Sequence, residues 1–133
     1  MYKRQHYDTV EGTPGADDNA TAVAGLLEMH RLLSAHRPAR TVRFVAFTLE
    51  EPPFFSSDLM GSMQYAKSCE KRKDPIDFMI CLEMLGFGGR WVKQSYPFED
   101  MRKNYPSSGN FLAVVSLPSS SEFAYLWKNT WNT

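Results

Sequence analysis

The sequence contains no uninterrupted apolar run of about 18 residues, the length that a membrane-spanning helix requires, so no transmembrane helix is expected. Neither sign of charge is in excess, because 15 lysines and arginines balance 15 aspartates and glutamates. A formal net charge of zero gives no electrostatic reason to expect a nucleic-acid partner. The opening residues, MYKRQHYDTV, lack the apolar segment of a signal peptide, and none is expected there.

Cysteine and histidine are both scarce. The two cysteines, Cys69 and Cys81, have neither the CxxC spacing of a zinc motif nor the number that a disulfide framework needs. Both are expected to be free thiols, with Cys81 in the core, and cysteine usage leaves the compartment undetermined. Two of the three histidines, His30 and His36, fall on or after an expected helix and are interpreted as solvated side chains.

Hydrophobic residues make up 43% of the sequence, which is enough to form a core. The 133 residues are enough for one domain. Hydrophobic periodicity predicts alternating helices and strands. These are helix 20–35, strand 41–49, helix 58–70, strand 78–85, strand 110–117 and helix 119–129. Residues 1–19 are expected to be turn-rich, and residues 88–109 irregular. The alternation predicts an α/β sandwich with a mostly parallel sheet.

Finer expectations concern the first two helices. In the helix over 20–35, apolar residues recur every three or four positions, as a face toward the core requires, and Asp17 is placed to cap its start. In the helix over 58–70, the side chains expected to point inward are Leu59, Met63 and Ala66.

Acidic residues follow the expected strands. The segment FVAFTLEEPPFF ends an apolar strand on Glu50 and Glu51, and Glu83 stands near the end of the strand over 78–85. Ligands of open α/β sheets bind outside the carboxyl ends of the strands, so these acids are expected at one edge. Asp18, at the start of the first helix, is expected at the same edge.

One histidine belongs with these acids. His6 and Asp8 lie two residues apart, so their side chains point the same way if that segment is extended. Carboxylates that gather beside apolar strands repel one another and resist burial unless a cation joins them. Carboxylate oxygens and an imidazole suit zinc, manganese and similar divalent ions. Of Glu50 and Glu51, one can bind metal while the other accepts a proton from water.

Three blocks of the sequence resemble the co-catalytic zinc aminopeptidases, a family that also contains glutamate carboxypeptidases and glutaminyl cyclases. They are HYDTVEGTPGADDNATAVAGLLEMHRLL, VRFVAFTLEEPPFF followed by MGSMQYAK, and MICLEMLG. These blocks follow one another in the same order as in the family, and the resemblance extends over about residues 6–117. The resemblance implies a zinc exopeptidase-like (phosphorylase/hydrolase-like) three-layer sandwich with a mostly parallel central sheet, which is expected to be incomplete in residues 1–133.

The resemblance also implies roles for residues at its first block. His6 matches a zinc ligand, and Asp8 matches the acid that orients this histidine. Asp18 matches the carboxylate that bridges two zinc ions, and its peptide bond to Asn19 matches a cis bond of the family.

The other two blocks supply three further carboxylates. By resemblance, Glu50 is the general base, Glu51 is a zinc ligand, and Glu83 ligates the metal that His6 binds. The implied reaction is hydrolysis of N-terminal peptide bonds of a peptide substrate through a metal-activated water, with two zinc ions as cofactors.

The sequence departs from the family in two respects. No histidine follows Glu83, where the family has a last histidine ligand, and only MYKRQ precedes His6, where members carry further strands. The chain is therefore expected to be the middle of a catalytic domain. One alternative is an inactive remnant that folds and binds metal weakly, and another is glutaminyl cyclase chemistry with a single zinc.

Self-association through an exposed sheet edge is also expected, with Trp127 and Trp131 as candidate contacts. Members of the family are often secreted or periplasmic, but the compartment of this chain stays undetermined.

Overall fold

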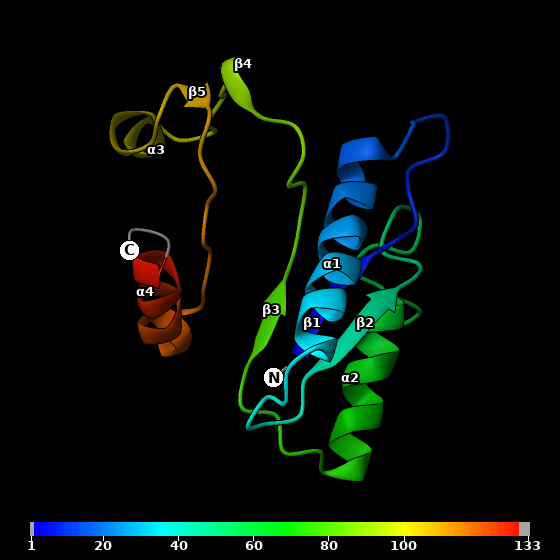
Figure 1. Cartoon of the computed structure of the whole chain (residues 1–133). Coiled ribbons are helices and arrows are strands. Elements are labelled where there is room, and N and C mark those ends of the chain that lie inside the picture. The colour runs from blue at the N-terminus through cyan, green and yellow to red at the C-terminus, as the bar shows by residue number, and fades with distance from the viewer. Residues whose placement is uncertain (1, 131–133) are drawn as a thin grey trace. The chain divides into compact units, whose positions relative to one another are not determined.

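The computed structural model describes residues 2–130 (Figure 1). Side chains are described from residue 5 onward. The chain divides into two compact units, Met1–Phe87 and Gly88–Thr133. The first contains β1 (Tyr2–His6), η1 (Ala16–Thr21), α1 (Ala22–Ser34), β2 (Arg43–Phe47), α2 (Gly61–Arg72) and β3 (Met79–Cys81). The second contains β4 (Gly89–Lys93), α3 (Glu99–Asn104), β5 (Ser108–Gly109), η2 (Pro118–Ser120) and α4 (Ser121–Thr130).

The sheet of the first unit has three parallel strands in the order β2-β1-β3. Its central strand, β1, lies in the segment that was expected to be turn-rich, so that expectation is wrong. The segment YKRQH has little apolar character, and it forms a strand because neighbours on both sides pair with its main chain. In this register His6 lies opposite Phe47, at the carboxyl end of the sheet.

Helices contact β2 from both sides. On one side, the Phe44 ring meets His30 of α1 edge-on, with ring centroids 5.3 Å apart. On the other side, the Phe47 ring lies 5.5 Å from Tyr65 of α2. Residues three apart in a strand point to opposite faces, so α1 and α2 lie on opposite faces of this strand. The predicted α/β class is confirmed.

The observed exposure of several side chains differs from the core that the sequence predicts. The helix over 20–35 is confirmed as α1, with Leu26 buried. In α2 the buried side chain is Cys69, whereas Met63 is 40% exposed and Leu59, before the helix, is 60% exposed, so the predicted inward face is wrong. Cys81 is exposed rather than in the core, because it lies at the end of the short strand β3, on the same face as the exposed Met79.

The second unit pairs β4 with β5 in antiparallel fashion (Figure 1). Residues 88–109, predicted to be irregular, therefore contain two strands and the helix α3. Residues 110–117, predicted to be a strand, form none, and Val115 in this segment is 91% exposed. Their apolar pattern suits a strand, but no described strand pairs with them. The final helix is confirmed as α4, and Trp131 lies outside the described residues.

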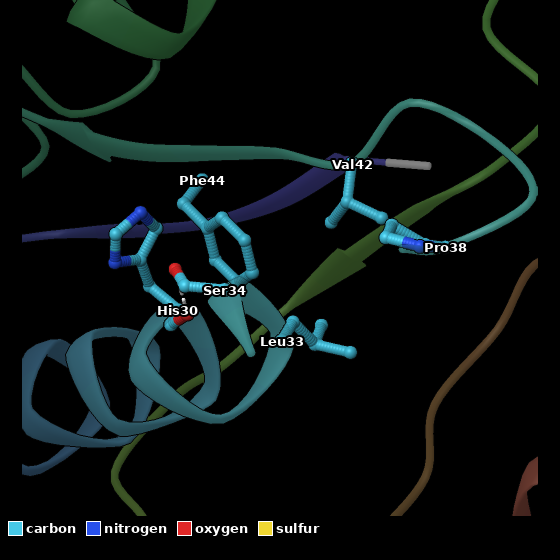
Figure 2. A pocket seen from close by; sticks show the side chains of 6 residues that line it. All are labelled: His30, Leu33, Ser34, Pro38, Val42 and Phe44. Carbon is cyan, nitrogen blue, oxygen red and sulfur yellow. Dashed lines mark hydrogen bonds between the residues drawn. The ribbon is translucent and has the colours of Figure 1, made fainter. Parts of the chain in front are cut away.

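A pocket of about 190 Å³ lies where the end of α1 meets the start of β2 (Figure 2). It is lined by His30, Leu33, Ser34, Pro38, Val42 and Phe44. His30 and His36 are both exposed, as predicted. The pocket lies at the amino end of β2, whereas Glu50 and Glu51 follow its carboxyl end. Among the described residues, no helix is long and apolar enough to cross a membrane.

Candidate metal centre

The carboxyl end of the three-stranded sheet brings the predicted site residues together. His6 is the last residue of β1, and Glu83 follows the end of β3 by two residues. Asp18 lies at a kink within η1, where the backbone is not helical. Glu50 and Glu51 follow β2 after a turn in which Leu49 has a φ of 59°, so they are not alternating residues of the strand itself.

The His6 ring lies at the centre of the acid cluster. Its Nε2 atom is 3.2 Å from Asp18 Oδ1, 3.2 Å from Glu83 Oε1 and 3.8 Å from Glu50 Oε2. Two sets of possible metal ligands result, each with ligand atoms within 4.8 Å of one another: His6 with Asp18 and Glu83, and His6 with Glu50 and Glu51. The predicted convergence is thus seen in the distances, while the role of each residue stays a prediction.

The other side of the His6 ring faces Asp8. The Nδ1 atom lies 3.1 Å from the main-chain oxygen of Asp8 and 3.7 Å from its Oδ1. A proton on Nδ1 donates to that carbonyl, so Nε2 is the nitrogen that faces the acids. In the protonated ring Nε2 donates to Glu83, and in the neutral ring its lone pair would be free to bind a metal ion. The second carboxylate oxygen of Asp8, Oδ2, accepts hydrogen bonds from the amides of Glu50 (2.9 Å) and Glu51 (3.1 Å). Asp8 therefore positions both the ring and the Glu50–Glu51 segment.

Side chains of η1 hold the segment that follows β3. Asp17 was predicted to cap a helix, but the start of α1 has no side-chain cap. Instead, Asp17 Oδ1 accepts from the amides of Gly86 (2.8 Å) and Phe87 (2.9 Å), and Thr21 Oγ1 accepts from Leu85 (3.1 Å). The same segment of η1 contains the cis peptide bond between Asp18 and Asn19 that the family resemblance implied.

Burial and mutual repulsion change the proton affinities of the cluster. Burial raises the pKa of Glu50 and Glu51, and the charges of neighbouring acids raise each further. Burial also raises the pKa of Glu83, against the hydrogen bond from His6, which lowers it. For His6, burial lowers the pKa, but the hydrogen bond to Glu83 and the charges of Glu83 and Glu50 outweigh it, so the pKa lies above 6.5. Each of these four side chains therefore binds a proton more tightly than it would in an ordinary solvated position.

The residues present fit a divalent metal ion. Glu51 Oε1 is buried and has no hydrogen-bond partner among the described residues. Among the side chains described, at residues 5–130, no lysine or arginine forms an ion pair with Asp18, Glu50, Glu51 or Glu83. A buried carboxylate oxygen without a donor is costly, and a metal ion is the partner that one imidazole and several carboxylates commonly share.

Without metal, the chain is expected to lose stability as the pH rises from about 4.5, the ordinary pKa of glutamate, toward neutrality. Glu50, Glu51 and Glu83 bind protons more tightly when folded than when unfolded, so removing protons favours unfolding. His6 acts in the same direction above 6.5. Thermal melting in a chelator between pH 5 and 8 measures this as a falling Tm, and the slope should be shallower in Glu83→Gln. A Tm that rises over this range would contradict the expectation.

Comparison with known proteins shows the family of the chain. Residues 4–121 match Peptidase family M28, so the chain belongs to this family. The uncharacterized protein YfbL of Escherichia coli (strain K12) is 47% identical over 119 residues, which are 83% of this chain and 36% of that protein. Aminopeptidase YwaD of Bacillus subtilis (strain 168) is 34% identical over 96 residues, 71% of this chain and 20% of that protein.

A probable zinc metalloprotease of Pyrenophora tritici-repentis (strain Pt-1C-BFP) is 32% identical over 89 residues, 61% of this chain and 19% of that protein. No solved structure matches the chain. The chain thus spans between 19% and 36% of the length of these three relatives.

Proposed function

We propose that this chain supplies metal ligands and the general base of a zinc-dependent exopeptidase of the aminopeptidase type, which hydrolyses N-terminal peptide bonds. The observation that carries the proposal is the geometry around His6. Its Nε2 lies 3.2 Å from both Asp18 and Glu83, beside a buried Glu51 oxygen that has no hydrogen-bond partner among the side chains of residues 5–130. Membership of Peptidase family M28 supports a peptide substrate. The name of the Bacillus subtilis relative, an aminopeptidase, supports the exopeptidase class.

His6, Asp18 and Glu83 would hold one zinc ion, since their ligand atoms already lie within 4.8 Å of one another. Asp18 and Glu51 would hold a second ion, as the resemblance to two-metal peptidases implies. Bound zinc would polarise the peptide carbonyl and lower the pKa of water from 15.7 to about 7.

Glu50 is the residue we assign to proton transfer. It accepts a proton from the attacking water and gives it to the leaving amine. Its pKa is raised by burial, which brings the carboxyl group closer to the working pH of a base. Glu51 is the better candidate ligand, because its Oε1 is buried and no donor in the described part of the chain bonds to it. Asp8 holds both residues by their amides and leaves their carboxylates available.

We also propose that both units of the chain belong to one catalytic domain with the three-layer, zinc exopeptidase-like fold. The family match over residues 4–121 extends across both units, which supports a single domain. The placement of α1 and α2 on opposite faces of β2 supports the three layers.

The test combines zinc content with hydrolysis by the purified chain. Two zinc ions per chain in elemental analysis, together with zinc-dependent hydrolysis of an aminoacyl anilide, are the expected results. One alternative is a non-catalytic chain that folds and binds metal weakly. Bound zinc without hydrolysis would select that alternative. One zinc ion per chain, together with cyclisation of an N-terminal glutamine, would support the other alternative, glutaminyl cyclase activity.

We also propose that two copies of the chain associate through an unpaired edge of the sheet. Within the described residues, β2 and β3 are the outer strands of the three-stranded sheet, and each has one side without a paired strand. Light scattering over a wide concentration range is expected to show the mass per particle rising with concentration. A particle of monomer mass at every concentration would contradict this expectation.

A further inference from the structure

Asn19 holds the main chain on both sides of Glu83. Its Nδ2 donates to the carbonyl of Leu82 (3.3 Å), and its Oδ1 accepts from the amide of Met84 (3.2 Å). The side chain is 1% exposed. Both of its polar atoms are therefore used in one two-point contact, with the candidate ligand Glu83 between the two points.

No strand pairing holds Glu83 in place. β3 ends at Cys81, where it pairs with Arg4, so Glu83 lies beyond the last paired residue of the sheet. Met84 has a φ of 45°, a left-handed conformation that residues other than glycine seldom adopt. Among the described hydrogen bonds, the one to Asn19 Oδ1 is the contact that holds the Met84 amide in this conformation.

The other side chains of η1 act further along the chain. Thr21 accepts from Leu85, and Asp17 accepts from Gly86 and Phe87. They hold the segment after Glu83 but not the residues on either side of it. Asn19 also follows Asp18 directly in the chain, so its main chain is bonded to one candidate ligand. Its side chain binds the two neighbours of another candidate ligand, Glu83.

We propose that Asn19 is a positioning residue that sets the distance between the Asp18 and Glu83 carboxylates and thereby the affinity of the metal centre; this rests on the proposed function. The two carboxylates lie equally far from His6 Nε2, at 3.2 Å. Removal of the Asn19 amide frees the Leu82 carbonyl and the Met84 amide, and Glu83 then leaves this arrangement. Residues that orient metal ligands typically change affinity by about 10–100-fold when they are replaced.

The experiment compares metal binding by the wild-type chain, Asn19→Ala and a stability control. Zinc affinity is measured by competition with a chromophoric chelator, and cobalt(II) is added separately to record its ligand-field spectrum. Asn19→Ala is expected to bind zinc at least about 10-fold more weakly and to shift the cobalt bands. The control, Phe47→Leu, disturbs packing against Tyr65 of α2 and is expected to lower Tm without shifting the bands.

The outcomes separate this inference from the proposed function. Wild-type zinc affinity and an unchanged cobalt spectrum in Asn19→Ala overturn the positioning role while leaving the metal centre intact. An equal loss of zinc affinity in Phe47→Leu also overturns it, because the effect is then one of general stability. A wild-type chain that binds neither metal overturns both proposals.

A further measurement does not depend on the folding of the variant. In the wild-type chain, hydrogen exchange of the Met84 amide is expected to be at least about 10-fold slower than in an unstructured peptide, since Asn19 holds it. Exchange at the unstructured rate overturns the inference.

Discussion

Replacement of Glu50 by glutamine is expected to lower hydrolysis of an aminoacyl anilide by about 100-fold or more, while zinc content stays at the wild-type value. General acid–base catalysis contributes about 10²–10⁴-fold, and an amide cannot accept the proton from water. The substitution keeps the size of the side chain. It also keeps the main-chain hydrogen bond from residue 50 to Asp8, so the local backbone is retained.

Initial rates and elemental analysis on the same preparations measure the two effects. Glu28→Gln is the matched control: Glu28 lies exposed on α1, paired with Arg31, and its replacement is expected to leave the rate unchanged. If Glu50→Gln hydrolyses the anilide as fast as the wild-type chain, the base is another residue. If it loses zinc as well, Glu50 is a ligand rather than the base.

Replacement of His6 by alanine is expected to weaken zinc binding by more than about 100-fold, the upper end of the loss seen when residues behind the ligands are replaced. His6 belongs to both groups of three possible ligands, His6 with Asp18 and Glu83 and His6 with Glu50 and Glu51. The second proposed ion shares Asp18 with the ion that His6 would hold, so loss of His6 is expected to weaken both. The change also removes the imidazole nitrogen that lies within 3.8 Å of the Asp18, Glu50 and Glu83 carboxylates.

Thermal melting with and without zinc measures this loss. At a free zinc concentration of about 100 times Kd, the wild-type chain should gain about 2.7 kcal/mol of stability, and His6→Ala should gain almost none. His30→Ala is the matched control, because His30 is exposed on α1 and contacts Phe44 away from the acid cluster. Equal stabilisation of His6→Ala and the wild-type chain by zinc would show that the metal binds elsewhere.

The sequence by itself indicated which side chains gather at the candidate site. Acids at the ends of apolar strands are visible in the sequence, because burial beside such strands is unfavourable for a carboxylate without a partner. The HYD pairing added His6 and Asp8 to the set. The positions of α1, β2 and α4 were also predictable, since their side chains repeat with the period of their own secondary structure.

Only the tertiary structure decided which segments pair and which atoms meet. The central strand β1 is polar, and it is a strand because β2 and β3 bond to its main chain, an effect that local periodicity does not contain. Residues 110–117 show the reverse: their apolar pattern predicts a strand, but no described strand pairs with them. In the sequence, Asn19 entered through its peptide bond to Asp18. Its contacts with Leu82 and Met84 join residues more than 60 positions apart, and such long-range contacts arise only when η1 and the end of β3 pack together.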